Sequence, residues 1–241
     1  MNKLSTILII KNEEDKIEAC LKSINWTDEI IIIDDESSDN TVSLAKKYTK
    51  NIYVRKLDNF ASQKNYGISK AHFLWILNID ADEIITPGLK NEIKNIFKNQ
   101  NLKDGYFIPF KNYLGKKWLK HGGLYPDYHL RLFKKDKARF EKSVHEEINL
   151  KNVGYLKNTI IHSTYDDYKD FWKKVKKYSR IEARLYTNKP SFLSYFKPIK
   201  FFLGIYLKKQ GFRDGFAGFI NALFLSLYDL RVYYYTRRNN Q

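Results

Sequence analysis

Residues 72–83 read HFLWILNIDADE and place an apolar run directly before a group of acids. The run at 72–77 has the composition of a strand buried on both faces, as strands of a parallel sheet are. Asp80, Asp82 and Glu83 follow it at once, although the chain as a whole is basic. Carboxylates this close repel one another and favour water or a positive partner. The stretch therefore predicts a buried strand that ends in either a solvated turn or a cation site.

Apolar runs of the same kind occur earlier in the chain, at 4–10, 29–34 and 51–55, and apolar residues recur at helical spacing over 17–24. Such alternation is the pattern of β-α-β units around a parallel sheet. From about residue 104 the pattern becomes that of an exposed antiparallel strand, followed by an aromatic, Gly-broken stretch typical of functional loops. We predict an α/β fold with a Rossmann-like, mostly parallel central sheet flanked by helices.

The net charge of the chain is +16, from 43 Lys and Arg against 27 Asp and Glu. A charge this large implies an anionic partner, which would be nucleic acid, a phosphorylated substrate or a membrane surface. The single cysteine, Cys20, excludes an internal disulfide and a Cys-rich zinc site and indicates a reducing compartment. The apolar run at 4–10 is too short for the core of a signal peptide, so we interpret it as a strand and expect the protein in the cytoplasm.

Acids follow three of the first four predicted strands, in KNEE (11–14), DDESSDNT (34–41) and DADE (80–83). Ligands of an open parallel sheet bind beyond the carboxyl ends of its strands, so these acids are expected at one edge. No G-x-G-x-x-G turn follows the first strand and no G-x-x-x-x-G-K-[ST] motif occurs. These absences disfavour both a Rossmann dinucleotide site and a P-loop.

Asp80 and Asp82 are two positions apart, so their side chains point to the same side if the strand geometry persists. Two oxygens placed in this way suit a hard divalent ion, Mg²⁺ or Mn²⁺, which commonly completes its coordination with water and substrate phosphates. The alternative is an ordinary acidic turn, because many D-x-D triplets are turns. The Asp80–Asp82 pair alone does not distinguish a metal site from a turn, and the sequence motifs on either side of it are needed to decide.

Those surroundings resemble a known family. STILIIKNEEDKIEACLKSI, IIIIDDESSDNTVSLAKKY and ASQKNYGISKAHFLWILNIDADEIITPG, in this order, are similar to the nucleotide-sugar-binding half of family 2 glycosyltransferases, which have the GT-A fold. GLYPDYHLRLFKK, SVHEEI and GFRDGFAGF resemble the bacterial branch that includes lipopolysaccharide-core β-glucosyltransferases. The resemblance implies a GT-A domain over 1–165, with a donor half at 1–100 and an acceptor half at 101–165. It also implies inverting, divalent-metal-assisted transfer from a UDP- or GDP-sugar to a glycan or lipid-linked acceptor of the cell envelope.

The resemblance also implies roles for single residues on the donor side. Asp35 matches the acid that binds the nucleobase, Asp80 the acid near the ribose, and Asp82 the acid that holds the metal on the diphosphate. Lys64 stands where the family usually has an Arg that faces the diphosphate, so the charge remains but the bidentate fork is lost. Arg131 is expected either to reach the pyrophosphate or to hold the acidic loop, with a structural salt bridge as an equal alternative. Glu13, in the first acidic loop, completes the expected donor site.

An inverting transfer also needs a carboxylate that takes the proton from the acceptor hydroxyl. By family analogy Glu146 in VHEE is the first candidate, and Asp127 in YPDYH is the second. His145 is interpreted as an acceptor contact or an ordinary loop histidine, in preference to a third metal ligand. Tyr125 is a plausible stacking surface for an acceptor sugar, although core packing is the more frequent use of an aromatic ring.

Residues 166–241 are Lys-rich, aromatic and helical in tendency. The stretch 216–228 has thirteen residues without a charge, whereas a membrane span needs roughly 20 apolar residues, so we predict a buried or interfacial helix. The stretch 192–209 mixes aromatic residues with Lys in a way that suits a surface lying on anionic lipid. The extension therefore predicts either a peripheral contact with the inner face of the cytoplasmic membrane or a helical bundle packed on the catalytic domain.

Two other functions compete with a glycosyltransferase. A nucleotidyltransferase that makes sugar nucleotides would also need paired acids and a parallel sheet, but the Gly-rich, basic loop that would hold a triphosphate is missing after the first strand. A non-enzymatic basic module for nucleic acid should show a clustered Lys/Arg stripe with a recognisable motif. The lysines are dispersed instead, so we expect no nucleic-acid partner.

Overall fold

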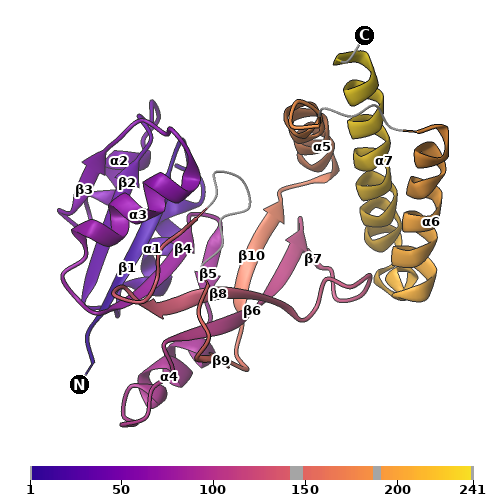
Figure 1. Cartoon of the computed structure of the whole chain (residues 1–241). Coiled ribbons are helices and arrows are strands. Elements are labelled where there is room, and N and C mark those ends of the chain that lie inside the picture. Colours follow the sequence, from indigo (N-terminus) through magenta and orange to yellow (C-terminus); the bar gives the residue numbers. More distant parts are fainter. Residues whose placement is uncertain (1, 142–148, 187–190, 240–241) are drawn as a thin grey trace. The chain divides into compact units, whose positions relative to one another are not determined.

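The computed structural model describes residues 2–141, 149–186 and 191–239 (Figure 1). The chain forms two compact units. The first contains Met1–Phe110 and Tyr128–His162, and the second contains Lys111–Asp127 and Ser163–Gln241. Strands β6 (Gly105–Leu114) and β10 (Ile160–Tyr165) run from the first unit into the second. The assignment of 1–100 to the donor and 101–165 to the acceptor stays a prediction.

The centre of the first unit is a group of parallel strands. β1 (Leu4–Ile10) lies between β2 (Glu29–Asp34) and β4 (Trp75–Asp80), and β3 (Ile52–Val54) extends the group beyond β2. Nearly every residue of β1, β2 and β4 is buried, which explains why their sequences are continuous apolar runs. The parallel strands predicted from the sequence are confirmed.

Four helices accompany these strands, and their sequences explain where they lie. Helix α1 (Ile17–Ile24) turns a fully buried face toward the sheet, and Thr86 caps the start of α4 (Pro87–Ile96) by accepting a hydrogen bond from the Leu89 N–H. Helix α3 approaches β1 so closely that a Cβ on Gly67 would lie 2.5 Å from Ile7 Cγ2. The helices are α1 (Ile17–Ile24), α2 (Thr41–Ala45), α3 (Phe60–Lys70) and α4 (Pro87–Ile96).

The remaining strands make the sheet mixed. Its order is β3-β2-β1-β4-β8-β6-β10-β5, and β7 (Lys117–Trp118) and β9 (Val153–Tyr155) both pair with β6. β8 (Asp127–Lys134) is antiparallel to β4, and β5 (Glu83–Ile85) is antiparallel to β10. The predicted α/β class is confirmed, and the antiparallel additions carry residues from the second half of the chain to the end of β4.

The second unit is mostly helical. In Figure 1, α7 (Phe216–Asn239) lies between α5 (Tyr168–Ala183) and α6 (Lys197–Leu203). Its core gathers Leu114, Leu119, Phe171, Val175 and Ala217, and other apolar residues of α7 pack against it. The uncharged stretch 216–228 therefore serves this core. Within the described parts of the chain, no helix combines the length and apolar composition that crossing a bilayer requires.

Candidate active site

The carboxyl end of β2 presents a buried aspartate with two fixed partners. Asp35 Oδ2 lies 2.8 Å from Lys11 Nζ, and Asp35 Oδ1 accepts a hydrogen bond of 2.7 Å from the Leu57 N–H. The Asp35 side chain is 5% exposed. Burial alone would raise the pKa of Asp35, but the Lys11 ammonium and the Leu57 N–H lower it below its usual value. Asp35 is therefore held as an oriented carboxylate at the predicted edge.

Hydrogen bonds join the loops that follow β1 and β2. The Glu13 N–H donates to Thr41 Oγ1 at 2.7 Å, and Ser38 N–H donates to Asn12 Oδ1 at 2.8 Å. These bonds keep Glu13 at the same edge of the sheet as Asp35, as the sequence predicted. Both loops are therefore shaped before a ligand arrives.

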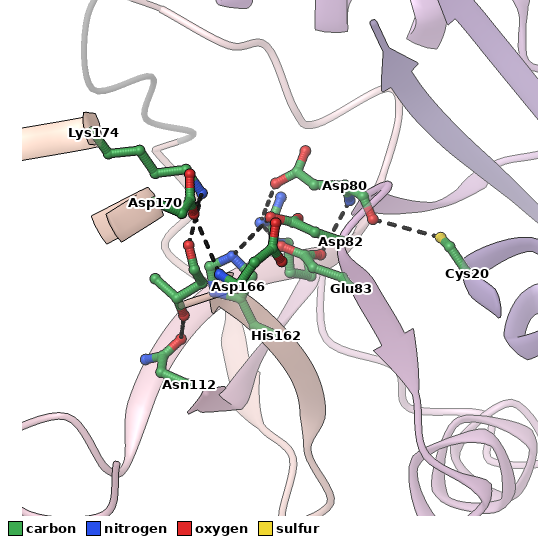
Figure 2. A network of polar contacts seen from close by, with 11 residues as sticks. Cys20, Asp80, Asp82, Glu83, Asn112, His162, Asp166, Asp170 and Lys174 are labelled. Carbon is green, nitrogen blue, oxygen red and sulfur yellow. Dashed lines mark hydrogen bonds and ion pairs between the residues drawn. The ribbon is translucent and has the colours of Figure 1, made fainter. Parts of the chain in front are cut away.

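The acidic turn after β4, with Asp80, Asp82 and Glu83 labelled in Figure 2, is organised by one arginine. Arg131 Nη2 donates to Asp80 Oδ2 at 2.8 Å and also to Glu83 Oε1. The second oxygen of Glu83, Oε2, accepts from the Asp80 N–H at 3.1 Å. Arg131 comes from β8, and it reaches the turn because β8 pairs antiparallel with β4. Arg131 therefore holds the acidic loop, which was one of the alternatives considered from the sequence.

Burial and charge separate the two carboxylates that share Arg131. Burial would raise the pKa of Asp80, but the Arg131 guanidinium and then the Lys64 ammonium hold it well below its usual range. The side chain of Glu83 is fully buried. Burial raises the pKa of Glu83 well above its usual value, Arg131 opposes this rise, and Asp80 adds to it. Three carboxylates, those of Asp80, Asp82 and Glu83, therefore meet two cations, Arg131 and Lys64, at this turn.

Asp82, Glu83 and His162 bring three potential metal ligands together (Figure 2). Their ligand atoms all lie within 4.8 Å of one another, and His162 Nε2 is 3.5 Å from Asp82 Oδ2. His162 stands directly opposite Glu83 in the β5–β10 ladder. Two carboxylates and one imidazole fit a divalent ion, with Mn²⁺ favoured over Mg²⁺ because of the nitrogen. This is the one such group in the described part of the chain.

This group differs from the pair predicted from the sequence. The D-x-D spacing predicted that Asp80 and Asp82 share the ion, whereas the structure pairs Asp80 with Arg131 and gathers Asp82 with Glu83 and His162. Neither Glu83 nor His162 was among the ligands predicted from the sequence. No local pattern could have linked these two residues, because their approach depends on the antiparallel pairing of β5 with β10.

Lys64 lies on α3 and acts on the acidic turn. It is one of the charges that lower the pKa of Asp80, and its Nζ lies 5.1 Å from the centre of the Phe140 ring. The side chain of the neighbouring Asn65 donates from Nδ2 to the Phe140 carbonyl at 2.9 Å, and its Oδ1 accepts from the Phe140 N–H at 3.0 Å. The chain is thus fixed beside α3 just before residues 142–148. The predicted residues Glu146 and His145 lie outside the described residues.

The other predicted acceptor residues belong to the second unit. Asp127 Oδ2 accepts a hydrogen bond of 2.9 Å from Asn112 Nδ2, and Asn112 Oδ1 accepts one of 3.3 Å from Thr164 Oγ1. Tyr125 stands edge-on to Trp118, with ring centres 5.2 Å apart. Asp127 is therefore a carboxylate positioned by Asn112, two residues after Tyr125 in the sequence.

The family model for glycosyl transferase family 2 matches residues 5–148. The chain belongs to this family. It is therefore a glycosyltransferase, its α/β architecture is GT-A-like, and the resemblance stated from the sequence is confirmed. Membership decides against the nucleotidyltransferase and the basic binding module.

Individual relatives agree with the family. This glycosyltransferase is 28% identical to an uncharacterized glycosyltransferase of Rickettsia typhi, over 99% of this chain and 90% of that protein. It is 27% identical to the lipopolysaccharide core biosynthesis glycosyltransferase LpsC of Rhizobium meliloti, over 93% of this chain and 88% of that protein. Among solved structures, residues 1–349 of S. aureus TarS in complex with UDP-GlcNAc align with a TM-score of 0.49 and 19% identity, over 95% of this chain and 82% of that chain.

Proposed function

We propose that this glycosyltransferase uses a nucleoside-diphosphate sugar, linked to UDP or GDP, with the help of Mn²⁺ or Mg²⁺. The observation that carries the proposal is the group of Asp82, Glu83 and His162 at the carboxyl edge of the parallel strands. Asp35, a buried carboxylate at the end of β2, lies on the same edge and can accept an N–H from a nucleobase. The arrangement supports a donor site in which the nucleobase and the diphosphate bind at separate places.

The residues of this chain divide the work of binding the donor. A divalent ion held by Asp82, with Glu83 and His162 as further ligands, would stabilise the negative charge that grows on the leaving diphosphate. Lys64 would add a positive charge on the same side. Arg131 keeps Asp80 and Glu83 in place, so the ligands need little rearrangement when the donor binds. Asp80 is then the acid nearest the ribose, as the resemblance implies.

We propose that the transfer inverts the anomeric centre and that one carboxylate removes the proton from the acceptor hydroxyl. Glu146 remains the first candidate, and Asp127 the second. If Glu146 is the base, Glu146→Gln is expected to retain donor binding and to lower transfer about a hundredfold, since a positioned base contributes about that much or more. Asp127→Asn is the matched control, because it keeps an acceptor for Asn112. Full activity of Glu146→Gln with loss in Asp127→Asn would assign the base to Asp127.

The acceptor is proposed to be a glycan or lipid-linked glycan of the cell envelope. The similarity to LpsC over most of both chains supports this class. Such an acceptor would place the enzyme in the cytoplasm, at the inner face of the cytoplasmic membrane. His145 and Tyr125 remain proposed acceptor contacts.

Donor use is tested by incubating the protein with UDP- and GDP-sugars in the presence of Mn²⁺, Mg²⁺ or EDTA. One nucleoside diphosphate with metal is expected to raise Tm by about 5–10 °C at a concentration near 100 times its Kd, because ligands that bind only the folded state stabilise it. EDTA is expected to remove most of this shift, and the matching sugar nucleotide should release nucleoside diphosphate. A protein that responds to no nucleoside diphosphate, with metal or without it, would contradict the proposal.

A further inference from the structure

One helical run of the second unit carries its large apolar side chains on the outside. The run extends over Phe192–Phe196, α6 and Gly204–Lys208. Phe196, Ile199, Leu203 and Leu207 follow one another at intervals of three or four residues, so they lie on one face. Each of them is between 46% and 59% exposed. A soluble helix normally shows polar residues on such a face.

The opposite face of the same run is packed, so the exposure does not come from a loose helix. The Phe202 and Tyr206 rings lie 5.9 and 5.7 Å from the Phe219 ring of α7, and Ile205 is buried. Figure 1 shows α6 alongside α7. The exposed residues therefore point away from α7, because they alternate with the packed ones around the helix.

Two further exposed phenylalanines lie near the helical run. Phe212 and Phe216 are 49% and 66% exposed. Phe212 lies 6.3 Å from the Tyr206 ring, and Phe216 lies 6.4 Å from the Phe219 ring. Phe212 therefore adjoins the helical run at Tyr206, and Phe216 adjoins Phe219 of α7. We call these six side chains the apolar surface: Phe196, Ile199, Leu203, Leu207, Phe212 and Phe216.

Positive charges alone surround the apolar surface within its own segment. Residues 196–216 contain five cations and a single acid, Asp214. Asp214 is 5% exposed and is occupied by His121, whose N–H donates to it at 2.7 Å and whose Nδ1 lies 2.7 Å from its other oxygen. It therefore does not offset the cations at the surface. The cations are Lys197, Lys200, Lys208, Lys209 and Arg213.

We infer that the apolar surface docks into the headgroup region of an anionic lipid bilayer. Apolar side chains that enter the acyl boundary with lysines at the phosphates are the pattern of an interfacial helix. Each Lys or Arg near an anionic membrane contributes about 1 kcal/mol. A second copy of the chain fits less well, because it would bring the same cations face to face. The inference deepens the proposed membrane location of the acceptor by naming the surface that makes the contact.

The test is co-sedimentation of the full chain with phosphatidylcholine vesicles, with or without phosphatidylglycerol. The wild type is expected to bind the anionic vesicles more tightly than the neutral ones. The double variant Leu203→Asp and Leu207→Asp should lower the partition coefficient at least about tenfold, since it removes two apolar contacts and adds two negative charges. Leu74→Asp is the matched control, because Leu74 is 44% exposed in the first unit, and it should bind like the wild type.

A second variant, Lys197→Gln with Lys200→Gln, keeps the test decisive if the aspartates disturb folding. This variant should bind anionic vesicles more weakly at low salt, and its vesicle binding should change less as the salt concentration rises. The inference would be overturned if the wild type did not bind anionic vesicles, or if Leu74→Asp lowered the partition coefficient as much as the double leucine variant does. A dimer that the leucine variant dissociates, without vesicle binding by the wild type, would assign the surface to a second copy instead. Vesicle binding needs neither donor nor acceptor, so its failure is distinguishable from failure of sugar transfer.

Discussion

Asp82→Asn is expected to lower kcat/KM for sugar transfer about a thousandfold, which corresponds to about 4 kcal/mol of transition-state stabilisation. The amide keeps the size of the side chain but removes the charge that a divalent ion needs. Asp82 is partly exposed and faces His162, so the substitution leaves no buried group without a partner. The variant should unfold at the wild-type denaturant concentration, but its Tm should no longer rise with Mn²⁺ and nucleoside diphosphate.

Asp136→Asn is the control for this experiment, because Asp136 is an exposed acid of the same unit outside the site. It should retain activity and metal response. His162→Gln then tests which residues bind the ion. If the ligands are Asp82, Glu83 and His162, the affinity of this variant for Mn²⁺ should fall about tenfold, which is 1.4 kcal/mol. If His162→Gln binds Mn²⁺ as tightly as the wild type, the metal ligands would be the predicted pair, Asp80 and Asp82. Full activity in Asp82→Asn would exclude the metal site altogether.

Arg131→Met is expected to lower the free energy of unfolding by about 3–5 kcal/mol, because it removes one partner of a buried ion pair and leaves the other. Glu83 is fully buried and Arg131 is 11% exposed, so the loss is assigned to this pair. Asp80 is 42% exposed, and water screens its share. Urea unfolding of both proteins measures the difference. Lys134→Met, on the same strand as Arg131, breaks a pair with Asp104 in which the side chains are 22% and 27% exposed, and it should cost far less.

The cost of Arg131→Met should shrink in acid. Asp80 has a lowered pKa in the folded protein, so its contribution is present above the ordinary Asp pKa of about 4 and is lost as the pH falls through its folded pKa. The raised pKa of Glu83 also makes the cost smaller in acid, because protonation of Glu83 removes the negative charge that Arg131→Met leaves without a partner. Adding Glu83→Gln to Arg131→Met should restore part of the stability at neutral pH. A loss that is the same at all pH values would contradict this account of the pair.

Much of the fold and the acidic edge of the parallel strands followed from local patterns. The strands at 4–10 and 29–34 were predicted with the bounds observed, because a strand covered on both faces has to be a continuous apolar run. The placement of Asp35 and Asp80 at one edge followed from the parallel direction of those strands. The residues beyond 104 gave a weaker signal: β6 was expected as an exposed strand but is mostly buried, because it lies between β8 and β10, which come from distant parts of the chain.

By itself, the sequence determined the parallel strands, the acidic edge and the family of this protein, because period, spacing and motif order are local properties. Only the tertiary structure decided which charges meet. Arg131 reaches Asp80 and Glu83 through the β4–β8 pairing, and His162 reaches Glu83 through the β5–β10 pairing. It also decided that α7 serves a core while Leu203 and Leu207 stay exposed. The physical reason is that ion pairs, ligand groups and burial depend on distances between segments, which composition and periodicity do not encode.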